Sequence, residues 1–325
     1  MEFDIILNPK GMESTYIDYL NLSFGHWGDA ALYRWCFNRR IGDLNADIMI
    51  FKQDEKVIAG SAVTYRKVLL GKSIINVGIM TGSWTLPEAR GQGCFTKIIE
   101  ESLSLASRKG AALLIAFLTQ SNASFRRLAN AGSSLFPTHY LFSGQNTPVP
   151  ESGHVVSPVS DMRKGIETIF ETLRKRQDGF AHFVYTVKEW ESQFLERPGE
   201  IELLRIDDIG LAIVEKKGDF DRVLLLSLKE ERAFSDCIKA LLRRALENGR
   251  KLFLFTTSTF WKDECLKLGL GHSPGYLTAL VADENELIKI YPGVSSLPEN
   301  IANEFYEPVS PWCIGSWDIQ SGDRM

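Results

Sequence analysis

The chain has 325 residues, 44% of them hydrophobic, so it is long enough for two domains that each bury a core. Its formal net charge is −4 at pH 7 and its isoelectric point is about 5.8. This balance argues against general attraction to nucleic acid or to a membrane surface, so we expect neither as a partner.

The cysteines and the apolar runs indicate a reducing compartment. The five cysteines are odd in number and no two have the spacing of metal ligands, which favours free thiols and predicts no metal site. The first residues lack the basic segment of a signal peptide, and the longest apolar run, residues 111–118, is too short to cross a bilayer. The sequence thus predicts a soluble, cytoplasmic protein. The cysteines are Cys36, Cys94, Cys237, Cys265 and Cys313.

The first 145 residues predict an alternation of helices and strands. Two helical pieces come first, and three β-branched, hydrophobic stretches follow them as expected strands. A helix, a strand, a second helix and a final strand complete this half. The helices are expected at residues 15–38 (broken at 25–29), 95–109 and 122–131, and the strands at 48–51, 57–70, 73–86, 112–118 and 135–142.

The most informative stretch is the turn at residues 87–97, between the strand at 73–86 and the next helix. Its glycines, Gly91 and Gly93, let the backbone approach a ligand closely. The N–H groups of a first helical turn have no intrahelical partner, so with the helix dipole they attract an anion. We interpret the turn as a phosphate site. It is not a P-loop, because no Gly-Lys-Ser/Thr closes it, and the dinucleotide pattern Gly-x-Gly-x-x-Gly fails at Thr96.

This turn resembles the acyl-CoA loop of the GCN5-related N-acetyltransferase (GNAT) superfamily. That family's signature is Arg/Gln-x-x-Gly-x-Gly/Ala after a strand that ends near Pro-Glu. Arg90, Gly93 and Pro87-Glu88 match the signature, whereas Phe95 departs from its last position. The order of elements over residues 1–145 is also similar to the GNAT order. The resemblance implies an α/β (α+β) fold with a mixed central sheet flanked by helices.

A similar plan recurs after a stretch rich in Pro, Gly and Ser at residues 146–160, which we interpret as a linker. Residues 161–290 repeat the hairpin, the helix and the next strand. The glycine loop is missing, and residues 227–232 hold two carboxylates in its place, which would repel a phosphate. We therefore predict two GNAT-like domains, the first at residues 1–145 and the second degenerate, followed by a tail at 291–325.

The resemblance implies where acyl-CoA would bind in the first domain. Pantetheine would pair with the edge of the strand at residues 82–86, and the loop N–H groups would hold the pyrophosphate. Asn122 occupies the family's position for a contact to pantetheine, and it is equally the expected cap of its helix. Arg126 and Arg127 would reach the ribose 3′-phosphate unless they are simply solvated. The expected co-substrate is acetyl-CoA or a longer acyl-CoA. The predicted cofactor-binding residues are Trp84, Leu86, Arg90, Gly91, Gln92, Gly93, Cys94, Phe95, Thr96, Asn122 and Arg126.

The acid and base that are usual in the family are missing. The tyrosine expected four residues before Gly132 is Leu128 here, and residues 76–86 contain no acid or histidine. Catalysis then rests on positioning, or on a base from elsewhere. A histidine titrates in a suitable range, although a lone strand histidine is also often structural. The candidate catalytic residues are His139 and Tyr140 on the last strand of the first half, and Asp318 or Asp323 in the tail.

The resemblance implies an acyl-CoA-dependent N-acyltransferase that acts on a small primary amine. Tandem GNAT-like chains of this length resemble bacterial enzymes that acylate amino sugars on dTDP- or UDP-linked sugars for surface polysaccharides, so we expect such an acceptor. The alternatives are an aminoacyl-tRNA-dependent, peptide-forming transferase and a non-catalytic CoA-binding protein. Aromatic and cationic residues available for a nucleotide sugar are Trp261, Tyr276, Trp312, Trp317, Lys262 and Arg205.

Overall fold

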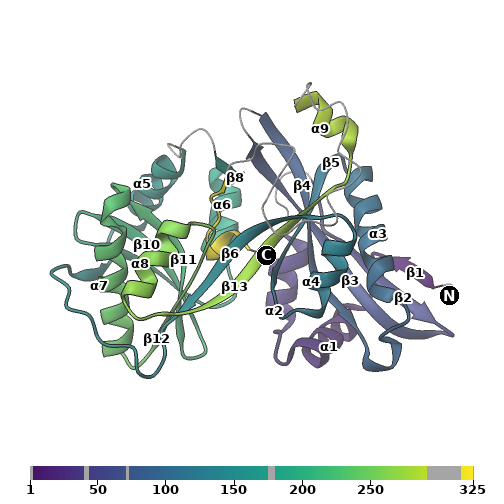
Figure 1. The fold of residues 1–325 in the computed structure, drawn as a ribbon, viewed down its shortest axis with the longest axis horizontal. Coiled ribbons are helices and arrows are strands. Elements are labelled where there is room, and N and C mark those ends of the chain that lie inside the picture. Colours follow the sequence, from purple (N-terminus) through teal and green to yellow (C-terminus); the bar gives the residue numbers. More distant parts are fainter. Residues whose placement is uncertain (1–2, 40–43, 71–72, 175–179, 291–315, 325) are drawn as a thin grey trace.

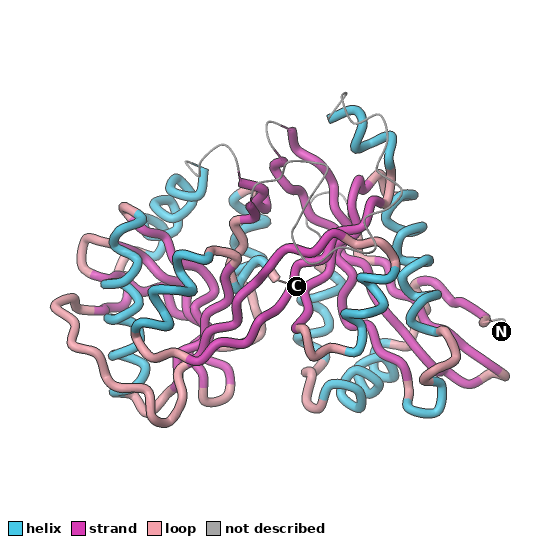
Figure 2. Tube along the Cα trace, in the orientation of Figure 1, coloured by secondary structure: helices cyan, strands magenta, loops and turns pink. Residues whose placement is uncertain are grey.

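The computed structural model describes residues 3–39, 44–70, 73–174, 180–290 and 316–324. They form two α/β lobes that share one sheet, with helices on both of its faces (Figure 1). The strand order is β1-β2-β3-β4-β5-β13-β6-β12-β11-β10-β9-β7. Figure 2 shows the strands running from one lobe into the other without a break. The mixed α/β class predicted from the sequence is confirmed.

Both faces of the sheet are buried in the first lobe, because successive apolar side chains of its strands point to opposite faces. In β2, Met49 and Phe51 pack with α3 and α4, while Ile48 and Ile50 pack with α1 on the other face. The elements of this lobe are β1 (Asp4–Leu7), α1 (Glu13–Phe24), α2 (Ala30–Tyr33), a π-helix (Arg34–Asn38), β2 (Asp47–Gln53), β3 (Lys56–Leu70), β4 (Ser73–Thr85), a 3-10 turn (Pro87–Ala89), α3 (Cys94–Arg108), β5 (Ala111–Thr119) and α4 (Ala123–Asn130).

The second lobe follows the same principle. In β9, Leu203 packs with α5 and α6, and Leu204 packs with α7 and α8 on the opposite face. Its elements are β7 (Val156–Pro158), α5 (Met162–Arg174), α6 (Val187–Phe194), β9 (Glu200–Ile206), β10 (Gly210–Lys217), β11 (Phe220–Leu228), a 3-10 turn (Glu231–Ala233), α7 (Phe234–Glu247), β12 (Lys251–Thr256) and α8 (Thr259–Lys267). The strand β8 (Phe180–Val184), between α5 and α6 in the chain, pairs instead with β3 of the first lobe. The short strand β7, which pairs with β9, lies within the expected linker.

The two lobes exchange their last strands. β13 (Gly271–Val281), from the second half, pairs with β5 of the first lobe. β6 (Ser134–Phe142), from the first half, pairs with β13 on one side and with β12 of the second lobe on the other. The strand expected to complete the first domain therefore lies beyond β13, because β13 occupies the position beside β5. A cut after residue 145 would leave the first lobe without its neighbouring strand.

Residues 316–324, called the C-terminal segment below, lie between the lobes. The segment contains β14 (Ser316–Trp317), which pairs with β8, and a 3-10 turn (Ser321–Asp323). The end of the chain thus sits in the middle of the molecule (Figure 1). α9 (Glu284–Ile290) precedes this segment, and most of the predicted tail, including Trp312, lies outside the described residues. Within those residues, no helix combines the length and apolarity needed to span a membrane.

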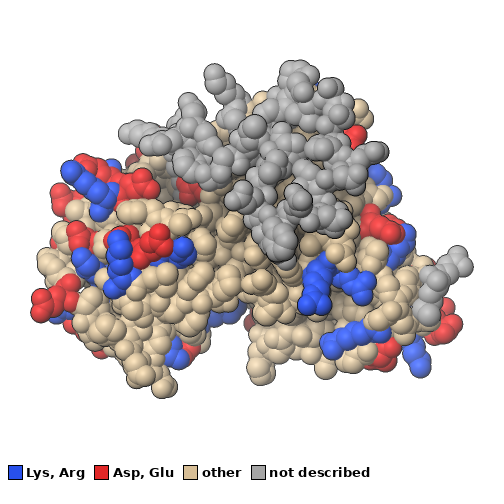
Figure 3. Space-filling view, viewed as in Figure 1, with Lys and Arg blue, Asp and Glu red and all other residues tan. Residues whose placement is uncertain are grey.

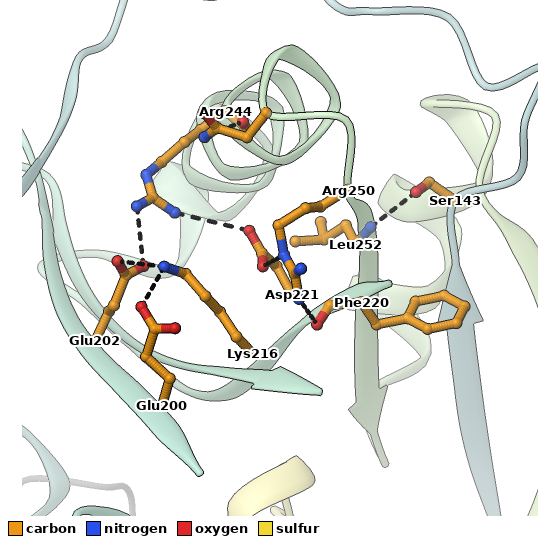
Figure 4. Close-up of polar contacts among 10 residues, drawn as sticks. Ser143, Glu200, Glu202, Lys216, Phe220, Asp221, Arg244, Arg250 and Leu252 are labelled. Atoms are coloured by element: carbon orange, nitrogen blue, oxygen red, sulfur yellow. Dashed lines mark hydrogen bonds and ion pairs between the residues drawn. The ribbon is translucent and has the colours of Figure 1, made fainter. Parts of the chain in front are cut away.

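Charged residues of the second lobe neutralise one another in a network (Figure 4). Arg244 of α7 donates to Glu202 of β9 at 2.9 Å and lies 3.7 Å from Asp221 of β11. Asp221 also pairs with Arg250, and Lys216 pairs with Glu202 at 3.1 Å. This network joins four elements of the second lobe through satisfied ion pairs.

Candidate functional site

The glycine turn presents free backbone donors, as the sequence predicts. Gly91 and Gly93 have φ of +83° and +85°, a region that glycine adopts without strain. Gly93 is the N-cap of α3 and provides no side chain to accept from the helix. The first intrahelical bond runs from the Lys97 N–H to the Gly93 oxygen at 3.1 Å. The N–H groups of residues 94–96 therefore have no acceptor within the helix.

A gap between β4 and β5 lies beside this turn. The two strands pair in parallel only as far as Ile79 and Ile115, although both continue for several residues. β4 bulges against β3 near Gly82, whose φ is +57°. A bulge re-aims the backbone and ends regular pairing. Beyond it the strands enclose a cavity of about 790 Å³, called the β4/β5 gap below.

Most of the predicted cofactor-binding residues line this gap. Their shared position is explained by the fold, because β4, the glycine turn, α3 and α4 all meet here. The residues that line it are Trp84, Arg90, Gly91, Gly93, Cys94, Phe95, Thr96 and Asn122.

Three of the predicted residues do not line the gap. Leu86 is buried in the core beneath α1, and its N–H donates to the Ile58 oxygen at 2.9 Å. The Gln92 N–H lies 3.4 Å from the Ala89 oxygen inside the turn. Arg126 is exposed on α4, whereas its neighbour Arg127 lines the gap.

Two lining residues owe their positions to specific local contacts. Trp84 stacks on Tyr19 with ring centroids 4.7 Å apart, and Gly60 makes room for its indole, because a Cβ there would lie 2.6 Å from the ring. Asn122 is at the N-cap position of α4, but its Oδ1 accepts from the Thr119 hydroxyl at 3.1 Å rather than from the helix. Its amide NH₂ has no acceptor among the described residues.

The β4/β5 gap is cationic. Its charged lining residues are Arg90, Arg127 and Arg324, and no acid, histidine or tyrosine occurs among the described residues that line it. Figure 3 shows Lys and Arg side chains gathered over α4, beside the boundary between the lobes. Cys94 also lines the gap, but burial raises the pKa of its thiol, so it is not a ready nucleophile. Such a lining suits an anionic ligand.

The candidate catalytic residues lie elsewhere. His139 is buried at the junction of the lobes, where its Nδ1 is 3.2 Å from His272 Nε2. Burial, aided by His272 and Lys262, lowers the pKa of His139 to about 4. Tyr140 lies beneath Arg324, and the backbone N–H of Asp318 donates to the Ala181 oxygen at 2.9 Å. Asp323 is buried and accepts from the Tyr185 hydroxyl. None of the four candidates, His139, Tyr140, Asp318 and Asp323, lines the gap.

The residues considered for acceptor binding are also outside the gap. Trp261 stacks on Phe234 at 4.4 Å and Tyr276 on Phe125 at 4.9 Å, both as parts of lobe cores. Trp317 is buried against Phe136. Lys262 of α8 and Arg205 of β9 belong to the second lobe.

Arg324 is the charged lining residue that sequence reasoning missed. It follows the last 3-10 turn of the C-terminal segment and reaches a gap made mainly by residues 79–128. No motif surrounds it, and its place depends on how the chain end packs between the lobes. A cation near the end of an aperiodic tail gave no signal of this role.

The second lobe has a corresponding gap that is filled. β11 and β12 pair in parallel only as far as Val223 and Leu254. Beyond that point the C-terminal segment lies between β11 and β12. The side chain of Gln320 bonds to both backbone groups of Leu226, at 2.7 and 3.3 Å, and the Ser321 hydroxyl accepts from the Phe255 N–H at 2.9 Å. We call this filled space the β11/β12 gap.

Comparisons with known proteins agree with this architecture. Residues 8–127 match the model of a family described as Acetyltransferase (GNAT) domain. No curated protein matches the chain. Among solved structures, N-myristoyltransferase of Saccharomyces cerevisiae with bound myristoyl-CoA and inhibitors has a TM-score of 0.62 at 9% identity, covering 86% of this chain and 80% of that one.

Two further solved structures are similar to the chain over most of its length. A GCN5-related N-acetyltransferase from Anabaena variabilis has a TM-score of 0.60 at 14% identity, covering 88% of this chain and 74% of that one. A tandem GNAT protein from the clavulanic acid biosynthesis pathway has a TM-score of 0.60 at 10% identity, covering 87% of this chain and 99% of that one. Residues 8–127 are therefore similar to a GNAT acetyltransferase domain, and the two-lobed fold of the whole chain is similar to the fold of these solved structures.

Proposed function

We propose that this chain, whose residues 8–127 match a GNAT acetyltransferase domain, is an acyl-CoA-dependent N-acyltransferase with a single acyl-CoA site in the β4/β5 gap. The observation that carries the proposal is the open gap directly beside the free N–H groups of the glycine turn. A strand edge without a partner can pair with an extended ligand, and the start of α3 attracts phosphate. Pantetheine and pyrophosphate are joined in that order in CoA.

Different residues around the gap would bind different parts of acyl-CoA. Residues 93–96 and Arg90 would hold the pyrophosphate, and Arg127 the 3′-phosphate, through charge-assisted hydrogen bonds. The amide of Asn122 would donate to pantetheine. The donor would be acetyl-CoA or a longer acyl-CoA.

The transfer would proceed without a dedicated base at the gap. The neutral amine of the acceptor attacks the thioester carbon, the C–N bond forms and the C–S bond breaks. The thiolate leaves and takes up the proton that the nitrogen loses. A thiol with a pKa near ~8.5 is an adequate leaving group.

For the acceptor, we propose a primary amine on a nucleotide-linked amino sugar. The cationic lining of the gap supports an acceptor that carries negative charge, and the diphosphate of such a sugar meets this requirement. A peptide-forming reaction with aminoacyl-tRNA has less support, because the chain is acidic overall and retains the acyl-CoA loop.

One observation favours a second candidate, a CoA-binding protein without turnover. Leu128, at the position of the family's usual tyrosine, lines the gap, and the described lining offers no acid or histidine in its place. Such a protein would bind acyl-CoA and release no thiol with any amine.

The experiment that separates these proposals is a thiol-release assay. Acetyl-CoA and longer acyl-CoAs are first tested for binding by calorimetry, and each is then incubated with dTDP- and UDP-linked amino sugars and with simple amines. We expect thiol release that depends on one class of acceptor. Binding without release would favour the second candidate, and no binding of any acyl-CoA at millimolar concentration would refute both.

A further inference from the structure

The guanidinium of Arg324 occupies an unusual position in the β4/β5 gap. It lies over the rings of Phe255 and Tyr140, at 4.4 and 4.7 Å from their centroids, and over Phe117 at 6.0 Å. Phe117 belongs to β5 and itself lines the gap. Arg324 thus reaches the gap from the C-terminal segment, whereas Arg90 and Arg127 reach it from the glycine turn and α4.

Arg324 has no anionic partner among the described residues. No carboxylate or carbonyl there accepts from its guanidinium, and its Nε is buried without an acceptor. Burial lowers the pKa of Arg324, yet an arginine stays protonated at neutral pH. Aromatic faces stabilise such a cation, but its in-plane N–H groups still require acceptors. Arg197, another buried arginine nearby, instead pairs with Glu215 at 3.4 Å.

The backbone beside Arg324 is held in place by several bonds. The Gly322 oxygen accepts from Gln193 at 2.5 Å and from Arg197 at 3.4 Å. Asp323 accepts from the Tyr185 hydroxyl at 3.1 Å. A Cβ at Gly322 would lie 2.2 Å from the ring of Phe194, so the chain passes here in close contact. The guanidinium is therefore preorganised before any ligand arrives, which reduces the entropy lost on binding.

We propose that Arg324 binds an oxyanion carried by the acceptor, so that the enzyme acts on amines that also bear a phosphate or a carboxylate. This inference rests on the proposed function, because it assigns the acceptor to the same gap as acyl-CoA. A planar guanidinium with free N–H groups matches either oxyanion in a bidentate arrangement. The aromatic rings behind it exclude water and strengthen that bond.

The two sources of the oxyanion differ in chemistry and can be separated. A nucleotide-linked amino sugar presents a diphosphate, and an amino acid presents a carboxylate. We choose two pairs of probes that differ only in the charged group: dTDP with thymidine, and 4-aminobutyrate with butylamine. Each probe is titrated calorimetrically into CoA-saturated protein.

The variants are Arg324→Gln and Arg324→Lys. Arg163→Gln is the matched control, because Arg163 has a side-chain exposure of 91% and lies on α5, away from the gap. We expect one oxyanion-bearing probe to bind wild type and the control more tightly than its partner without the oxyanion. Arg324→Gln should weaken that probe at least about tenfold and leave the partner without the oxyanion unchanged. Arg324→Lys should fall between, because it keeps the charge but loses the fork.

The responding pair identifies the source: dTDP indicates a phosphate and 4-aminobutyrate a carboxylate. Equal binding of the probes with and without the oxyanion, or an Arg324→Gln variant that binds like wild type, would overturn the inference. The CoA affinity of each variant is measured as a control for folding. Retained CoA binding shows that a variant is folded, and if Arg324→Gln does not fold, Arg324→Lys carries the test. A wild-type protein that binds no CoA would refute the proposed function instead, and this inference with it.

Discussion

The two lobes solve the same structural problem in different ways. In each, two parallel strands pair for four residues and then separate, β4 from β5 and β11 from β12. Separated strands leave backbone N–H and C=O groups that need partners. In the second lobe the C-terminal segment supplies them through Gln320 and Ser321. In the first lobe the corresponding space is an open cavity, and we propose that acyl-CoA supplies them.

The two lobes also differ in how their charged side chains are paired. In the second lobe, Arg244 and Arg250 pair with Glu202 and Asp221 (Figure 4). The place of its glycine turn holds Glu230 and Glu231. In the β4/β5 gap the arginines have no carboxylate partner among the described residues. A lobe that stabilises itself pairs its charges internally, whereas a binding lobe keeps them available for a ligand. The comparison supports our proposal that the ligand binds in the first lobe, and we propose that the second lobe provides structural support.

The largest effect should follow from removing the contacts that fill the β11/β12 gap. Gln320→Ala leaves both backbone groups of Leu226 without partners in a buried place. We expect the free energy of unfolding to fall by about 2–4 kcal/mol, because each buried group left unsatisfied costs about 1–3 kcal/mol. Urea denaturation measures this.

Gln120→Ala is the control for that substitution, since Gln120 is exposed and should lose less than about 0.5 kcal/mol. The affinity for acyl-CoA of the folded Gln320 variant should stay near wild type. A Gln320 variant as stable as the control would mean that the segment merely lies beside the strands.

A smaller effect concerns pH and the junction of the exchanged strands. The pKa of His139 in the folded chain is about 4, below the ~6.5 of an exposed histidine. Between these values the unfolded chain binds the proton and the folded chain does not, so stability falls as pH drops from about 6.5 to 4. We expect His139 to contribute about 1–3 kcal/mol of this loss.

The measurement compares unfolding free energies at pH 7 and pH 4.5 for wild type, His139→Asn and the control His26→Asn, since His26 is exposed. The pH-dependent loss should shrink only in the His139 variant. If the unfolding free energy falls equally between pH 7 and pH 4.5 in both variants, protonation of His139 does not cause the loss. If His139 were the catalytic base, the thiol-release rate would instead lose its pH dependence in that variant.

The smallest effect separates two adjacent arginines of α4. Arg127 lines the gap and Arg126 does not, although both are exposed. Arg127→Ala should weaken acyl-CoA binding three- to tenfold, about 0.7–1.4 kcal/mol, and Arg126→Ala less than about twofold. The difference should decrease at high salt because exposed charges are screened. Equal losses from both variants would show that α4 attracts the ligand only through its general charge.

The glycine turn could be predicted from the sequence because its information is local. Gly91 and Gly93 have the positive φ that glycine allows, and α3 begins directly after them. The alternation of helices and strands was also readable, because apolar spacing follows the faces of each element. These features depend on neighbours within a few residues.

The strand exchange and the filled gap could not be predicted, because they depend on competition between distant segments. β6 and β13 have similar apolar patterns, and nothing local decides which of them pairs with β5. Gln320 bonds to Leu226 across 94 residues, and Arg324 reaches the gap from the same C-terminal segment. His139 looked suitable as a base by residue type, and only the fold shows that it is buried beside His272.

The most direct test of the account is the number of acyl-CoA molecules bound per chain, measured by calorimetry for wild type, Gly93→Asp and Gly218→Asp. Both glycines have positive φ and open space around the missing Cβ, so the backbone strain of the two substitutions is matched. We predict one site in wild type, a loss of affinity of at least about tenfold in Gly93→Asp, and no change in Gly218→Asp. Two sites per chain, or wild-type affinity in Gly93→Asp, would contradict the assignment of acyl-CoA to the β4/β5 gap.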